Sequence, residues 1–236
     1  MDGHYSQFDW IVFDADETLF QFDAQRGLQL TFAHYGFDFS DAEFERYKAV
    51  NVALWQAYER GEVVAAEVQV QRFEYWGRLL NQPPVILNQH YLNTMGDICE
   101  MLPGVASLLQ RLAGKVRLGI ITNGFASLQP VRLARTGIAD IIEMLVVSEL
   151  VGAAKPDVAI FEHALQQMGD VLPARVLMVG DNPFTDIKGG NNAGMKTCWL
   201  NVTGRAVPEG VVPTWQVPTM FHLEQLLFAP TDVLSR

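Results

Sequence analysis

Short apolar segments rich in β-branched residues recur along the chain, and their alternation with helical segments constrains the fold more than any other feature. Uninterrupted apolar runs of a few residues are typical of strands that are buried on both faces. Segments with helical periodicity lie between the later runs. Strands that alternate with helices predict an α/β protein with a Rossmann-like parallel sheet, covered by helices on both faces. The expected strands span residues 10–13, 116–121, 144–147, 176–179 and 196–200, and the expected helices span 105–112, 130–135 and 157–168.

A long helical block separates the first apolar segment from the second. Residues 40–43 read Ser-Asp-Ala-Glu, a capping box that marks the start of a helix. A second stretch of helical periodicity covers residues 65–80. Because no strand pattern is interleaved here, we expect a helical insert at residues 21–100. The remaining parts, residues 1–20 and 101–236, would form the core that carries the sheet, with a short tail after Pro230.

The composition excludes a disordered chain and argues against two classes of partner. Hydrophobic residues make up 49% of the 236 residues and charged residues 19%, which is enough apolar material for a packed core. With 27 acidic and 17 basic side chains the net charge is −10, whereas a nucleic-acid polymer or an anionic membrane would require a basic surface. A small anionic ligand stays compatible with this charge, because one pocket can be positive on an acidic protein.

The sequence shows no membrane-spanning segment and no export signal. No apolar run approaches the roughly 18–20 residues of a membrane span, and the N-terminus lacks the basic and apolar regions of a signal peptide. Cys99 and Cys198 are far apart and match no metal-binding spacing. We therefore expect two reduced thiols in a cytoplasmic protein.

Polar residues follow four of the expected strands. An aspartate in such a position is commonly only a helix or turn cap, but ligands of open parallel sheets bind at the carboxyl ends of the strands. We therefore expect the polar residues to share one edge of the sheet. They are Asp14, Asp16 and Thr18 after the first strand, Thr122, Asn123 and Gly124 after the second, Lys155 after the third, and Asp181 and Asp186 after the fourth.

The residue types at this edge indicate phosphate chemistry. Clustered carboxylates repel one another unless a cation or a proton compensates them, and oxygen donors favour a hard ion such as Mg²⁺. A divalent ion, Lys155 and the N–H groups of a turn together make a phosphate site. Asp14 and Asp16 are two residues apart, so at the end of an extended strand both face the same way. One can attack phosphorus while the other handles the proton of the leaving oxygen.

These residues, in this order, resemble the four motifs of the haloacid dehalogenase superfamily, and the resemblance covers essentially the whole chain. The helical insert lies where that family places its C1-type cap. Within the superfamily the chain looks like bacterial house-cleaning pyrimidine 5′-nucleotidases. One departure is Glu17, where glycine often follows the second aspartate. The segments that carry the closer resemblance are residues 13–20, 49–55, 120–125, 177–181 and 198–201.

The resemblance implies a role for each motif residue. Asp14 would form an aspartyl phosphate, and Asp16, with a raised pKa, would act as general acid and then as general base. Mg²⁺, or Mn²⁺ in its place, would be held by Asp14, the Asp16 carbonyl and Asp181, with Asp186 acting on the metal or through water. Thr122, Asn123 and Lys155 would bind the phosphate.

The expected substrate is a small phosphorylated metabolite, a pyrimidine nucleoside 5′-monophosphate such as dUMP, UMP or dTMP, hydrolysed by a monomer or homodimer. Candidate base-pocket residues are Phe20, Asn51, Trp55 and Phe125, although the aromatic ones are also typical packing residues. Other activities stay open: a phosphatase for phosphoglycolate or a sugar phosphate, a sugar phosphomutase, a haloacid dehalogenase, or a binding module without catalysis. The presence of Asp16, Asp181 and Asp186 argues against a dehalogenase, and the intact motifs argue against a binding module.

Overall fold

The computed structural model describes residues 3–230, which form two compact units. The core unit contains the chain up to Gln21, residues 100–124 and the chain from Gly137 onward, and the helical unit contains residues 22–99 and 125–136. Residues 231–236, where we expected a tail, lie outside the described part.

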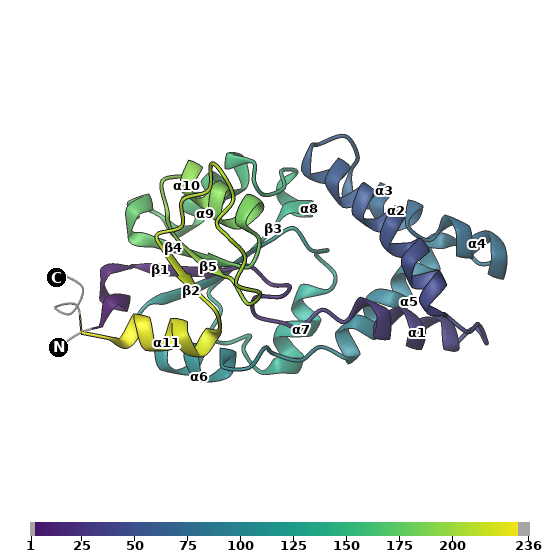
Figure 1. Ribbon diagram of the computed structural model, residues 1–236, viewed down its shortest axis with the longest axis horizontal. Helices are drawn as coiled ribbons and strands as arrows, with labels where there is room; N and C mark the ends of the chain where they lie inside the picture. Colours follow the sequence, from purple (N-terminus) through teal and green to yellow (C-terminus); the bar gives the residue numbers. More distant parts are fainter. Residues whose placement is uncertain (1–2, 231–236) are drawn as a thin grey trace. The chain divides into compact units, whose positions relative to one another are not determined.

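A six-stranded parallel sheet forms the centre of the core unit, which confirms the expected fold class. Its strand order is β3-β2-β1-β4-β5-β6, with β1 as a central strand (Figure 1). The last strand was not predicted, because three residues are too few for an apolar pattern. The strands are β1 (Trp10–Phe13), β2 (Arg117–Thr122), β3 (Met144–Val147), β4 (Val176–Gly180), β5 (Lys196–Leu200) and β6 (Trp215–Val217).

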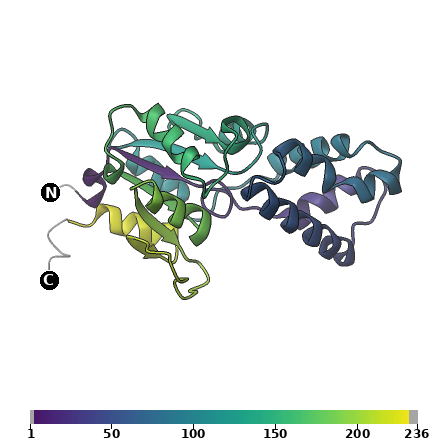
Figure 2. The same ribbon diagram turned by 90° about the horizontal axis from the view of Figure 1, so that it is seen from above.

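Helices cover both faces of this sheet (Figures 1 and 2). On one face lie α8 (Ser148–Val151), α9 (Val158–Met168) and α10 (Lys188–Asn192), and on the other lie α6 (Val105–Leu112) and α11 (Met220–Phe228). Short helical turns complete the unit: η1 (His4–Gln7), η2 (Pro173–Arg175) and η3 (Pro183–Ile187). Within residues 3–230, no helix combines the length and the apolar character that crossing a bilayer requires.

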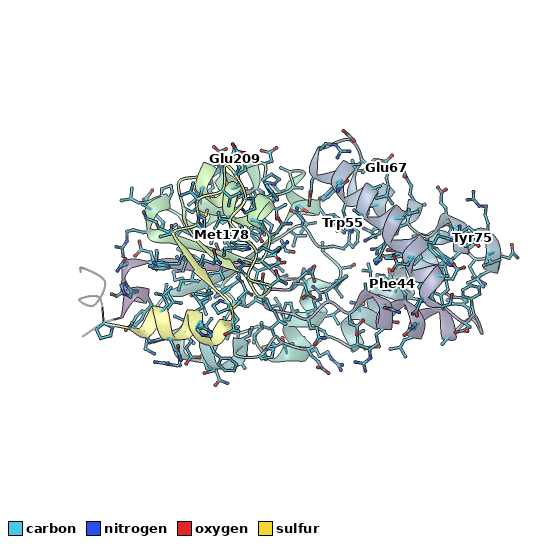
Figure 3. The ribbon with its side chains drawn as sticks, viewed as in Figure 1. Phe44, Trp55, Glu67, Tyr75, Met178 and Glu209 are labelled. Carbon is cyan, nitrogen blue, oxygen red and sulfur yellow. The ribbon has the colours of Figure 1, made fainter. Side chains whose placement is uncertain are left out.

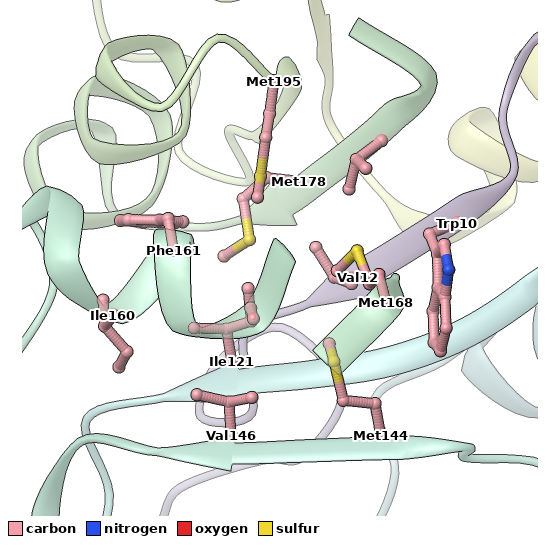
Figure 4. Packing of buried hydrophobic residues seen from close by; sticks show 12 residues of the cluster. Trp10, Val12, Ile121, Met144, Val146, Ile160, Phe161, Met168, Met178 and Met195 are labelled. Atoms are coloured by element: carbon pink, nitrogen blue, oxygen red, sulfur yellow. The ribbon is translucent and has the colours of Figure 1, made fainter. Parts of the chain in front are cut away.

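The core beneath α9 is built from the strand residues that alternate toward that face. Val12, Ile121 and Val146 come from three neighbouring strands and meet Ile160 and Phe161 of α9 (Figure 4). All five side chains are buried. Burying each side chain stabilises the fold by about 1.5–3 kcal/mol. The strand ends that carry the polar motifs therefore extend from a well-packed core.

The helical unit consists of six helices packed around aromatic side chains. Its elements are α1 (Ala24–Ala33), α2 (Asp41–Glu59), α3 (Ala65–Gln71), α4 (Glu74–Leu80), α5 (Pro84–Asp97) and α7 (Gln129–Thr136). Phe32 lies at its centre and contacts Phe39, Phe73 and Trp76 at ring-centroid distances of 4.8–6.3 Å.

Two expectations for the helical insert need correction. The stretch over 65–80 is two helices rather than one, because the chain turns at Arg72 and Phe73 so that both side chains are buried. The capping box is half formed: the Ser40 hydroxyl accepts a bond from the Glu43 N–H, but the Glu43 carboxylate accepts from the indole of Trp76 instead.

Residues 125–136, which we expected in the core, cluster with the helical unit. Helix α7 packs closely on α5: a Cβ atom at Gly96 would meet Val131 Cγ1 at 2.8 Å. Only a glycine allows this approach of the two helices. The guanidinium of Arg135 adds a bond to the Cys99 carbonyl.

Candidate active site

The first polar motif begins where β1 ends. The Asp14 N–H donates to the Val179 carbonyl at 2.9 Å, so the backbone of Asp14 continues the parallel ladder between β1 and β4. This pairing fixes the direction of the Asp14 side chain, which is mostly buried with 13% of its surface exposed.

Lys155 is the centre of the polar cluster. The residue is 1% exposed, and its ammonium donates to Asp14 Oδ1 at 2.6 Å, to Asp186 Oδ1 at 2.7 Å and to the Ile121 carbonyl at 2.8 Å. Because an ammonium has three N–H donors, each of them is already in use. A phosphate could accept a hydrogen bond from Lys155 only by replacing one of these three acceptors. The positive charge of Lys155, in contrast, attracts a nearby phosphate even when all three hydrogen bonds stay in place.

The carboxylate of Asp186 is held by a hydrogen bond from Asn182 and lies directly against Gly180. It lies in η3, a single π-helical turn after β4, whose N-cap Asn182 accepts from the N–H groups of Phe184 and Thr185. The Asn182 N–H in turn donates to Asp186 Oδ2 at 3.0 Å. A Cβ atom at Gly180 would lie 2.2 Å from the same oxygen, so the carboxylate can occupy this position only next to a glycine.

The carboxylates of this cluster are not fully compensated by one lysine. Burial raises the pKa of Asp14 to about 8, although the Lys155 ammonium acts in the opposite direction. Burial and the neighbouring Asp186 carboxylate raise the pKa of Asp181 to about 7. For Lys155, burial alone would lower the pKa, but Asp14 and Asp186 reverse this and raise it. The lysine therefore stays charged while two of the carboxyls titrate near neutral pH.

The donor set fits a hard divalent cation. Oxygen atoms of Asp14, Asp181 and Asp186 all lie within 4.8 Å of one another. Oxygen-only donors are what Mg²⁺ and Mn²⁺ prefer, and a cluster with more negative charge than Lys155 neutralises gains from a second cation.

The loop after β1 places Asp16 and a strained residue beside this cluster. The backbone of Asp16 bridges to Phe20, and the Asp16 carboxylate contributes to the raised pKa of Asp14. Glu17 adopts a left-handed conformation with φ 55°, which its N–H stabilises by donating to the Phe20 carbonyl at 2.8 Å. Such a conformation is unusual for a residue other than glycine. Thr18 follows and is fully buried.

The second motif forms a small turn at the end of β2. The Gly124 N–H donates to Thr122 Oγ1 at 3.0 Å. The Asn123 side chain makes two bonds to the backbone of Lys155, donating to its carbonyl at 2.9 Å and accepting from its N–H at 2.8 Å. The amide of Asn123 thus holds the backbone of Lys155 in place.

The candidate base-pocket residues divide between the two units. Phe20 belongs to the core unit and is fully buried, the environment of a packing residue. Asn51 and Trp55 lie on α2 of the helical unit, and Figure 3 labels Trp55. Phe125 also clusters with that unit, and its ring lies 5.1 Å from that of Trp55.

Two residues that shape the polar cluster or surround Phe125 were not singled out from the sequence. Gly180 is one of them: the Asp186 carboxylate lies so close to it that no residue with a Cβ atom fits at this position. Arg72, which stacks on the Phe125 ring at 4.8 Å, was not considered. The signal for Arg72 was a charged residue at an otherwise apolar position of a helical pattern.

The chain matches known proteins along most of its length. Residues 8–194 match the model of the haloacid dehalogenase-like hydrolase family. The chain is 51% identical to the pyrimidine 5′-nucleotidase YjjG of Escherichia coli K12, over 94% of this chain and 98% of that protein. It is 30% identical to the pyrimidine 5′-nucleotidase PynA of Streptococcus pneumoniae, over 89% and 91% of the two chains.

Solved structures lead to the same family. The magnesium-bound structure of the putative HAD-hydrolase YfnB from Bacillus subtilis superposes with a TM-score of 0.83 at 27% identity, and the match covers 94% of this chain and 99% of that one. The fold expected from the sequence is therefore that of a known enzyme family. The chain belongs to the haloacid dehalogenase-like hydrolases.

Proposed function

We propose that this protein is a Mg²⁺-dependent phosphatase that hydrolyses pyrimidine nucleoside 5′-monophosphates through an aspartyl phosphate on Asp14. The observation that carries the proposal is the 51% identity to a pyrimidine 5′-nucleotidase over nearly the whole chain. The buried group of Asp14, Lys155 and Asp186 supports it, because these side chains suit the transfer of a phosphoryl group.

The chain's own residues can perform both halves of the reaction. An Asp14 oxygen attacks phosphorus, the bond to the 5′-oxygen breaks, and Asp16 gives its proton to that oxygen. Asp16 then removes a proton from the water that attacks the phosphorus of the aspartyl phosphate, which returns Asp14 and releases phosphate. Lys155 keeps Asp14 in position and supplies a fixed positive charge, and positioning with charge compensation accounts for most catalysis of phosphoryl transfer.

Asp14 and Asp181, with the Asp16 carbonyl and the adjoining Asp186, would hold the Mg²⁺. When bound, the ion would neutralise negative charge on the transferring group. Because the two titrating carboxyls must lose their protons to hold the ion, binding should release protons near neutral pH. Cys99 and Cys198 are both buried and not joined in a disulfide, and a reducing, cytoplasmic setting is part of the proposal.

The test is phosphate release from a panel of monophosphates in the presence of Mg²⁺. We expect dUMP, UMP and dTMP to have a higher kcat/KM than AMP, GMP, phosphoglycolate or a hexose phosphate, and Asp14→Asn to abolish turnover of all of them. Di- and triphosphates should be poor substrates. A higher kcat/KM for phosphoglycolate or a hexose phosphate than for every pyrimidine nucleotide would overturn the substrate assignment.

A further inference from the structure

The helical unit contains the buried guanidinium of Arg72, which forms no ion pair with a carboxylate of the described residues. Arg72 is 3% exposed. Burying a charge is costly unless it is paired and hydrogen-bonded. A ligand group that accepts hydrogen bonds from Arg72 would offset part of this cost.

Hydrogen-bond acceptors and aromatic rings surround Arg72, but not every N–H donor of its guanidinium has an acceptor among the described residues. Its Nε and Nη2 donate to Asn88 Oδ1, and its Nη1 donates to the Tyr47 hydroxyl at 3.3 Å. The rings of Phe73, Tyr91 and Phe125 lie 4.8–5.2 Å from the guanidinium carbon, within the range of cation–π attraction. A guanidinium has five N–H donors, and three are accounted for. Two N–H groups have no acceptor among the described residues.

Helix α2 carries a second buried polar group that has no hydrogen-bond partner among the described residues. Tyr47, Asn51 and Trp55 are spaced four residues apart, so they lie on one face of the helix. Tyr47 bonds to Arg72, and Trp55 packs on the ring of Phe125, which Arg72 also contacts. Asn51 lies between Tyr47 and Trp55 on this face of α2. Its Oδ1 is buried and has no hydrogen-bond partner within the described chain.

The chemistry of this cluster fits a flat, neutral heterocycle better than an anion. Aromatic rings offer stacking surfaces, Asn51 supplies one acceptor and two donors, and Arg72 supplies donors in fixed directions. The edge of uracil and thymine reads carbonyl, N–H, carbonyl, which pairs with an arginine donor beside an amide. A carboxylate would satisfy Arg72 but would leave the Asn51 oxygen facing another acceptor.

We propose that Arg72 is a specificity-determining residue, which with Asn51 reads the 4-carbonyl and N3–H of uracil and thymine. The proposal rests on the function proposed above. Arg72 is buried more deeply than Asn51, and the 4-carbonyl is the part of the base farthest from the sugar, so the deepest donor meets the deepest acceptor. Cytosine carries an amino group at that position and would set a donor against the Arg72 donor.

The experiment compares kcat/KM for dUMP, dCMP and deoxyribose 5-phosphate in the wild type and in Arg72→Met and Arg72→Lys, with Mg²⁺ present. Arg78→Met, at an exposed position of α4, is the matched control. We expect Arg72→Met to lower kcat/KM for dUMP about 10–100-fold, as for the loss of one hydrogen bond from a charged donor, mainly through KM. The value for deoxyribose 5-phosphate should stay unchanged, and the preference for dUMP over dCMP should disappear. Arg72→Lys should keep part of the preference.

Equal losses for dUMP and for deoxyribose 5-phosphate would mean that Arg72 only supports the fold of the helical unit, which overturns the proposal. So would an unchanged ratio of dUMP to dCMP. If the wild type shows no preference for dUMP over deoxyribose 5-phosphate, the pyrimidine assignment itself fails, and this result is distinguishable from the others.

A substrate analogue tests the contacts to Arg72 and Asn51 without any variant that has to fold. The deoxynucleotide of 2-pyrimidinone lacks both the 4-oxygen and the N3–H, and the wild type should hydrolyse it with a kcat/KM at least about 10–100-fold below that for dUMP. Equal values for the two substrates would overturn the assignment of the 4-carbonyl to Arg72.

Discussion

Replacing Lys155 by methionine removes the charge that joins Asp14 to Asp186 while keeping a side chain of similar length. The variant loses three hydrogen bonds of 2.6–2.8 Å from a residue that is 1% exposed. Removing one partner of a buried ion pair typically destabilises a protein by about 3–5 kcal/mol. Because one ammonium serves two carboxylates here, we expect the upper end of that range, about 4–5 kcal/mol, for the metal-free protein near pH 8.

The destabilisation should depend on pH. With a folded-state pKa of about 8, against 3.8 for an ordinary aspartate, Asp14 is protonated at a mildly acidic pH and no longer needs the lysine charge. Near pH 5.5 only the pair with Asp186 is lost, and we expect about 3 kcal/mol. In Lys155→Met the carboxyls bind protons still more tightly, so the stability of this variant falls more steeply as pH rises.

Urea unfolding of the metal-free wild type and variant at both pH values measures this difference. Lys196→Met, at an exposed position of β5, is the control and should change stability by less than about 0.5 kcal/mol. A loss for Lys155→Met that is equal at the two pH values, or no loss at all, would refute the coupling of Lys155 to two buried carboxylates.

Three further predictions concern the same site. In the folded state the pKa values of Asp14 and Asp181 are raised to about 8 and about 7. The folded protein therefore keeps two protons that the unfolded chain loses near pH 4. Without metal, its stability should fall as the pH rises from about 4 to about 8. Thermal unfolding should show this decline, Mg²⁺ should restore stability at the upper end, and a curve that rises with pH would contradict it. Gly180→Ala places a methyl group 2.2 Å from Asp186 Oδ2, and we expect about 1–3 kcal/mol of destabilisation from overpacking together with loss of activity; wild-type activity in this variant would show that Asp186 can move freely. Glu17→Gly removes a side chain held at φ 55° and should stabilise the protein by up to about 1 kcal/mol, measured by urea unfolding, whereas destabilisation would indicate that the Glu17 carboxylate makes a net favourable contact.

The core unit followed closely from the sequence because its signals are local. A strand buried on both faces needs an uninterrupted apolar run, and residues 144–147 and 196–200 match the observed strands at both ends. The carboxyl ends of parallel strands share one edge, so the meeting of Asp14, Lys155 and Asp186 could be expected from their order alone.

The features that sequence reasoning missed depend on contacts between distant segments. The helix break at Arg72 and Phe73 follows from their burial against α2 and α5, which no local pattern encodes. Residues 125–136 lie in the core by sequence position, but the contact of Val131 with Gly96 groups them with the helical unit. The three acceptors that occupy the Lys155 ammonium likewise come from three separate segments, namely the ends of β1 and β2 and the turn η3, so its full occupancy could not be read from a motif.

Covalent capture of the phosphoryl group on Asp14 tests the central claim of the proposed function most directly. The enzyme is mixed with Mg²⁺ and dUMP labelled in the phosphate, the reaction is stopped with acid within the first turnovers, and the protein is digested and analysed by mass spectrometry. We predict a phosphorylated Asp14 peptide that hydroxylamine removes, that disappears with longer reaction times, and that Asp14→Asn does not form. Phosphate release from dUMP at full rate with no phosphoryl group on Asp14, or with the group on another residue, would contradict the account.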